Sequence, residues 1–144
     1  MQLTIVMRKV GRETSNCLKT IESFKHEDVE LTDVIFIDKL SDIDYGMIKS
    51  DWWIVLYDDE WIDPRLLEAM IVGSKCERFD VFVFYKIDKD VKVTICPRMF
   101  RNSVRIEKDF LYPILPVNME TLLDGWVYEH SIEEQFNVND ENRS

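Results

Sequence analysis

The chain has 144 residues, a length that suits one domain with a substantial buried core. Hydrophobic residues make up 46% of the sequence and charged residues 32%, as in folded soluble proteins, and no apolar run is long enough to span a membrane. The formal net charge of −10 disfavours binding to nucleic acid, because an acidic chain repels phosphate backbones, and favours the attraction of Mg²⁺ or Mn²⁺.

The three cysteines, Cys17, Cys76 and Cys96, are odd in number and lack CxxC spacing. This usage predicts reduced thiols rather than a disulfide framework or a zinc site, and hence a cytoplasmic protein. Residues 1–10 read as a strand followed by charges, not as a signal peptide.

Strand and helix patterns alternate in the first half of the chain. Residues 3–7 form an apolar run that predicts a buried strand, and the apolar residues from Cys17 to Phe24 recur at helical spacing. Residues 30–38 and 51–56 predict the second and third strands. A helical pattern then runs from Pro64 to about Val72, and proline is well tolerated in a first helical turn.

The second half of the chain is richer in strand patterns. Residues 80–87 and 91–99 predict two strands, which residues 88–90 join as a hairpin. Residues 104–107 predict a further short strand, and residues 119–123 predict a short helix.

The order of these elements predicts one α/β domain over residues 1–136, followed by a polar tail over residues 137–144. We expect a mixed, mostly parallel central sheet flanked by helices. In such open sheets, ligands bind where the strands end at their carboxyl edge.

Three acids, Asp58, Asp59 and Glu60, follow the third predicted strand directly. Carboxylate oxygens at a strand end are suitable ligands for a hard divalent cation, which often uses one or two protein carboxylates plus the phosphates of a substrate. The alternative interpretation is structural, since acids before a helix also stabilise its dipole. Asp63, directly before Pro64, is best explained as the helix N-cap.

Several segments resemble family 2 glycosyltransferases, the nucleotide-sugar enzymes of the GT-A fold. The most specific segment is residues 46–70, which resembles the stretch that carries the DxD motif, with Trp61 and Pro64 at the expected spacing. The other similar segments are residues 3–23, 33–42, 94–102 and 122–135. The resemblance implies a single GT-A-like, Rossmann-like domain.

The activity implied by this resemblance is metal-dependent transfer of a sugar from a nucleoside-diphosphate donor to an unknown acceptor. Asp59 would hold Mn²⁺ or Mg²⁺ together with Asp58 or Glu60, and Asp58 would also face the donor. His130 matches a position near the end of the family pattern that can bind the metal or the diphosphate, although a lone histidine is more often a partly buried polar residue.

The resemblance also implies roles for three residues outside the acidic turn. Asp38, at the end of the second predicted strand, would contact the nucleoside, and Arg98 would contact the diphosphate. Glu107 would be the base that activates the acceptor hydroxyl. Each residue has an alternative role without a ligand. Acids at strand ends are usually solvated, and Arg98 could balance the charge of nearby acids.

Two departures from the family pattern favour another class of protein. Tyr57 stands where the first Asp of the DxD triplet is expected, and no histidine precedes Glu107. The alternative is therefore a catalytically inactive binding or structural module, for example in a virus, that could also form homo-oligomers. A nucleotidyltransferase is less favoured, because no glycine-rich phosphate loop follows the first predicted strand.

Overall fold

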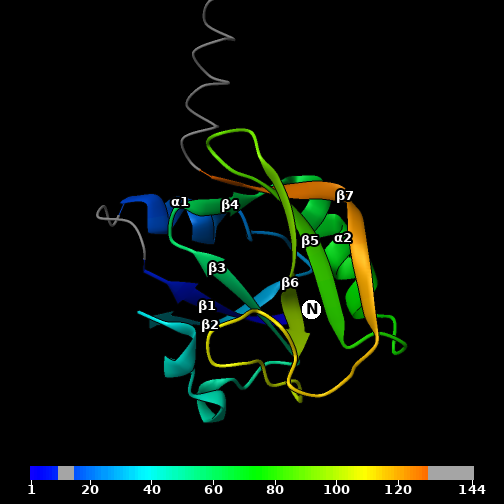
Figure 1. The fold of residues 1–144 in the computed structure, drawn as a ribbon. Coiled ribbons are helices and arrows are strands. Elements are labelled where there is room, and N and C mark those ends of the chain that lie inside the picture. Colours follow the sequence, from blue (N-terminus) through cyan, green and yellow to red (C-terminus); the bar gives the residue numbers. More distant parts are fainter. Residues whose placement is uncertain (10–14, 130–144) are drawn as a thin grey trace, which may run out of the picture.

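Seven strands form one mixed sheet in the computed structural model, which describes residues 1–9 and 15–129 (Figure 1). The strands lie in the order β2–β1–β3–β6–β5–β7–β4. Their bounds are β1 (Gln2–Arg8), β2 (Glu30–Ile37), β3 (Trp52–Tyr57), β4 (Glu60–Ile62), β5 (Val81–Ile87), β6 (Val93–Arg101) and β7 (Met119–Glu129). The helices are α1 (Ser15–Glu22) and α2 (Pro64–Ser74), with short 3₁₀ turns η1 (Leu40–Asp42) and η2 (Tyr45–Met47).

The predicted α/β class, a Rossmann-like sheet flanked by helices, is wrong. The described residues contain two α-helices, and the sheet that dominates them curls into a half-barrel (Figure 1). The sheet is mixed, as expected, but not mostly parallel. Three of its ladders are parallel (β1–β2, β1–β3 and β5–β7) and three are antiparallel (β3–β6, β5–β6 and β4–β7).

The predicted short helix over residues 119–123 is also wrong, because these residues begin β7. Met119–Leu122 pair in parallel with Val81–Phe84 of β5. A short apolar run does not distinguish helix from strand, so its secondary structure depends on whether a partner strand is available, here β5. The residues predicted as a short strand over 104–107 form only an isolated bridge, between Ile106 and Pro113.

Elements with strong local signals match their predictions. The buried strands β1 and β3, the β5–β6 hairpin and α2 are all present. Asp63 is the N-cap of α2, since its carboxylate accepts the backbone N–H of Arg65 at 2.8 Å. Pro64 occupies the first helical turn, where its missing N–H leaves no bond unmade.

Two apolar layers cover opposite faces of the sheet. On one face α2 buries Leu66, Leu67, Met70 and Ile71 against sheet residues that include Phe82. On the other face the segment 104–117 closes over Trp53 and Phe100, whose rings stack with centroids 4.5 Å apart. Both aromatic residues belong to the core.

The sheet splits next to the end of β3, and this split positions the candidate site. β3 pairs with β6 only from Trp52 to Ile54, whereas its later residues pair with β1 alone. The carbonyl oxygen of Val55 instead accepts a hydrogen bond from Nη1 of Arg98 at 3.1 Å. Charged side chains therefore occupy a gap that would otherwise leave backbone groups unpaired.

Candidate functional site

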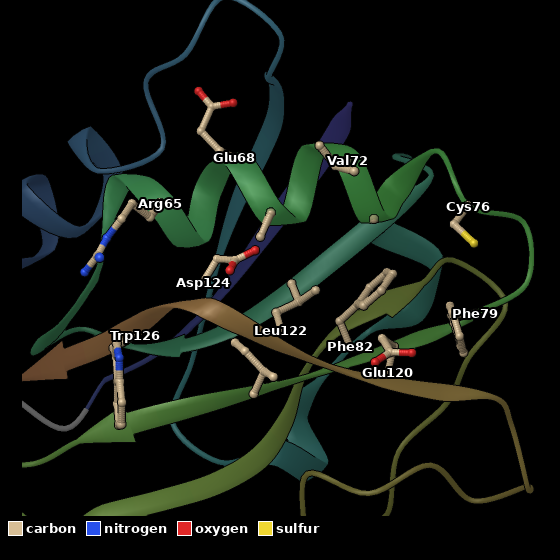
Figure 2. Close-up of a pocket in the computed structure, with 13 residues that line it drawn as sticks. Arg65, Glu68, Val72, Cys76, Phe79, Phe82, Glu120, Leu122, Asp124 and Trp126 are labelled. Carbon is tan, nitrogen blue, oxygen red and sulfur yellow. The ribbon is translucent and has the colours of Figure 1, made fainter.

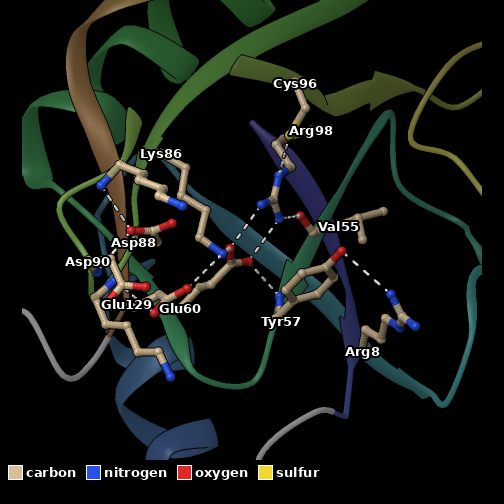
Figure 3. A network of polar contacts seen from close by, with 12 residues as sticks. Arg8, Val55, Tyr57, Glu60, Lys86, Asp88, Asp90, Cys96, Arg98 and Glu129 are labelled. Atoms are coloured by element: carbon tan, nitrogen blue, oxygen red, sulfur yellow. Dashed lines mark hydrogen bonds and ion pairs between the residues drawn. The ribbon is translucent and has the colours of Figure 1, made fainter. Parts of the chain in front are cut away.

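A buried ion cluster fills the split in the sheet (Figure 3). Glu60, which is fully buried, accepts two parallel bonds from the guanidinium of Arg98, each 2.8 Å long. Lys86 of β5 lies 2.6 Å from the same carboxylate and 3.4 Å from Glu129 of β7. The backbone N–H of Tyr57 donates a further bond to Glu60, at 2.7 Å. This carboxylate is thus held by three elements besides its own.

The electrostatics of the cluster keep Glu60 ionised. Burial alone would raise its pKa, but the charges of Arg98 and Lys86 outweigh burial and hold the pKa of Glu60 below its usual value. Burial likewise opposes the charge of Arg98, and the facing Glu60 carboxylate raises the pKa of that guanidinium above its usual value. Both oxygens of Glu60 are committed to cations of the protein, so its role here is structural.

Asp59, the neighbouring acid, has the opposite environment. Its Oδ1 atom is buried and has no hydrogen-bond partner among the described residues. Burial is the largest cause that raises the pKa of Asp59, and the adjacent Glu60 charge raises it further, while Lys86 lowers it in part. An unsatisfied carboxylate oxygen in such a place costs stability.

We expect Asp59→Asn to stabilise the protein at neutral pH. Because the folded-state pKa of Asp59 lies above its usual value of 3.8, the stability that this group contributes is full below that value and falls as the pH rises through the folded-state pKa. Thermal unfolding across this pH range should show a gain for Asp59→Asn that disappears in acid. The exposed Asp109→Asn, the control, should show no such gain, and equal curves for both variants would contradict the assignment.

Cations also surround the ring of Tyr57, the residue found in place of the first Asp of the triplet. The charged groups of Arg8, Lys86 and Arg98 lie 5.4, 5.2 and 5.2 Å from the centroid of this ring. Nη1 of Arg8 lies 3.5 Å from the Tyr57 hydroxyl, and its Nε donates to the backbone oxygen of Asp38 at 3.3 Å. Within the described residues, no carboxylate forms an ion pair with Arg8.

This group lies where three parallel strands end together. Arg8 is the last residue of β1, Tyr57 is the last residue of β3, and Asp38 follows the end of β2. The carboxyl edge of parallel strands is the usual place for ligands in open sheets. We call this group, Arg8, Asp38 and Tyr57 with Lys86 behind them, the edge site.

The structure brings together some of the predicted site residues and not others. Asp38 is exposed at the edge site, and the backbone N–H of the buried Asp58 donates to the backbone oxygen of Arg8 at 3.0 Å. Arg98 lies behind the edge, paired with Glu60. Glu107 is exposed in the segment 104–117, and no side-chain bond in the described chain joins it to the cluster.

The predicted metal site is described only in part, because His130 is not among the residues that the structure describes. They contain no group of three or more His, Cys, Asp or Glu side chains placed to hold a metal ion. Glu60 has no free carboxylate oxygen, because Arg98 and Lys86 bind both. Glu60 is thus held by cations of the protein, and the binding of Mn²⁺ or Mg²⁺ by Asp59, Glu60 and His130 stays a prediction.

Sequence reasoning missed Arg8 and Lys86 as members of a site. The signal for Arg8 was its place directly after the strand predicted over residues 3–7, where a cation reaches the carboxyl edge. Lys86 alternates with Phe82 and Phe84 on one face of β5, which indicates an inward-facing charge. A buried charge is costly unless it is paired, so this pattern predicts a buried acid as the partner of Lys86.

No family model matches the chain, and no curated protein matches it significantly. Among residues 1–9 and 15–129, no helix has the length and apolar character needed to cross a membrane.

Proposed function

We propose that the protein is a binding module for phosphate-bearing ligands, with a nucleoside diphosphate or nucleotide sugar as the ligand class. One observation carries the proposal: three cations surround Tyr57 at the carboxyl edge of three parallel strands, and Arg8 has no carboxylate partner within the described chain. The edge holds acids as well, since Asp38 is exposed there and Glu60 pairs with Lys86 and Arg98, so the proposal rests on Arg8.

The chemistry of the edge site suits a diphosphate. A guanidinium presents several N–H donors in a planar fork, which matches the oxygens of a phosphate. Arg8 is half-buried, so its side chain is partly desolvated yet remains accessible, and the Tyr57 hydroxyl beside it can donate a further bond. Lys86 and Arg98 are paired with Glu60, so Arg8 is the cation that we propose to contact the phosphate.

The same geometry favours binding without catalysis over metal-dependent sugar transfer. Glu60 is locked in an ion cluster, and Glu107 lies in another segment without a contact to that cluster. Charge on the ligand would be neutralised by cations of the protein instead of by a metal. Sugar transfer remains the second candidate function, because Asp59 keeps a buried carboxylate oxygen without a partner beside the edge site.

Substitution of Arg8 tests the binding proposal. Arg8→Gln should weaken the binding of UDP or GDP about tenfold or more, since charged hydrogen bonds contribute about 1.5–3 kcal/mol. The measurement is titration calorimetry of the full chain in EDTA. Arg105→Gln is the matched control, because Arg105 also lies over a tyrosine ring, at 4.4 Å from Tyr45, but belongs to the segment 104–117. Equal losses for both variants would contradict the proposal, as would binding that requires Mn²⁺.

Release of UDP from UDP-sugars separates the two candidate functions. A binding module leaves the donor intact, whereas a transferase passes some sugar to water. Hydrolysis that depends on Mn²⁺ and is lost in Asp59→Asn would replace the binding module with the transferase.

A further inference from the structure

A second surface lies between α2 and β7 (Figure 2). It is a groove with a volume of about 770 Å³, which is within the range of ligand pockets. Its apolar lining includes Ala69, Phe82 and Leu122. Val72 of α2 and Leu123 of β7 lie on its two sides and are 69% and 68% exposed.

Two glycines shape this groove. A Cβ atom on Gly73 would lie 2.9 Å from the ring of Phe82, so the absence of a side chain there leaves that ring in contact with α2. A Cβ atom on Gly125 would lie 2.3 Å from the backbone nitrogen of Leu66, so β7 passes directly against the helix at that point. The two glycines therefore let α2 approach Phe82 and β7 at the groove.

The charges around the groove are mostly negative. Glu68, Glu120 and Asp124 line it, and all three are exposed. The cation that lines it, Arg65, is bound to Asp63 at 3.0 Å. An apolar centre within a polar border is the usual composition of a protein-binding surface.

We propose that this groove binds an amphipathic segment of another protein, with apolar side chains at helical spacing flanked by Lys or Arg. The apolar face of such a segment would cover Val72 and Leu123, and its cations would face Glu120 and Asp124. Charge complementarity selects this occupant. The acidic border repels a second copy of this chain, which has a net charge of −10. It also repels residues 133–141 of the same chain, which are acidic.

The probe is a fluorescent peptide of leucine and lysine with leucines at helical spacing, titrated with the full chain and followed by anisotropy. Leu123→Asp should weaken binding about tenfold, because it removes apolar surface that the peptide would bury. Leu115→Asp is the matched control, because Leu115 is 72% exposed but lies outside the groove, and should bind as the parent does. Both substitutions are at exposed positions, and unchanged thermal unfolding verifies the fold.

Charge reversal at the border of the groove is the second test of the proposal. Glu120→Lys with Asp124→Lys should weaken the leucine–lysine peptide and strengthen a leucine–glutamate peptide. Asp51→Lys with Asp109→Lys changes the net charge equally at exposed positions outside the groove. Equal effects of the two double variants, equal binding by Leu123→Asp and Leu115→Asp, or light scattering that shows self-association through Leu123 would each overturn the proposal.

Discussion

Replacement of Arg98 by methionine should lower the free energy of unfolding by about 3–5 kcal/mol, the usual cost of removing one partner from a buried ion pair. Glu60 is fully buried and would lose both of its 2.8 Å bonds to the guanidinium. The carbonyl oxygen of Val55 would also lose its donor. Methionine keeps much of the volume, so the loss reports the charge rather than a cavity. Urea denaturation at neutral pH measures the effect.

The matched control is Arg65→Met, which removes an arginine from the ion pair with Asp63 at a side chain that is 73% exposed. Exposed pairs contribute about 1 kcal/mol or less, so this variant should stay close to the parent. The double variant Glu60→Gln with Arg98→Met should lose less than the sum of the two single losses, because the two residues act on each other. A cost for Arg98→Met no greater than that for Arg65→Met would show that the cluster is not structural.

Gly125→Ala should lower the free energy of unfolding by about 3 kcal/mol, the upper end of the usual cost of overpacking. The new Cβ would meet the backbone nitrogen of Leu66 at 2.3 Å and its Cα at 2.8 Å. Backbone atoms cannot turn aside as a flexible side chain does, so β7 or α2 would have to move. Both flank the proposed groove, so peptide binding should weaken as well.

Gly46→Ala is the control for this glycine. Its Cβ would meet only the Asp44 side chain, at 3.2 Å, and Gly46 is exposed in η2. Its unfolding transition should stay within about 1 kcal/mol of the parent, the usual range for alanine and glycine exchanges. If Gly125→Ala unfolds like Gly46→Ala, then β7 does not lie against α2 as described.

Local patterns predicted the elements whose signals are local. Each of these elements is specified by its own residues: β1 and β3 by their buried apolar runs, and the start of α2 by Asp63 and Pro64. The fold class depended on how the elements meet, and there the resemblance to a helix-flanked fold misled. The residues at the start of β7 become a strand because β5 offers a free edge, a fact that no window of the sequence around residue 119 contains.

The sequence predicted where the acids of the candidate site lie but not which side chains they contact. Asp59 and Glu60 do follow a buried strand, as the sequence indicated. Glu60 meets Arg98 because β6 returns antiparallel beside β3, which joins residues 38 positions apart. The order of the strands therefore gives Glu60, for which the sequence predicted a metal, a partner in Arg98. The sequence carries no specific signal for Arg8, because a single arginine at the end of a strand is common.

The most direct test of the edge site is a proton–nitrogen NMR spectrum of the arginine Nε–H groups during titration with pyrophosphate in EDTA. The signal of Arg8 should shift with saturation, whereas that of Arg98 should shift much less, because its Nε donates to Sγ of Cys96 and its guanidinium is buried against Glu60. Assignment uses Arg8→Gln and Arg98→Met, whose spectra each lack one of the two signals. If the Arg8 signal stays fixed up to millimolar pyrophosphate, or moves only after Mn²⁺ is added, a metal-free phosphate site at this edge is contradicted.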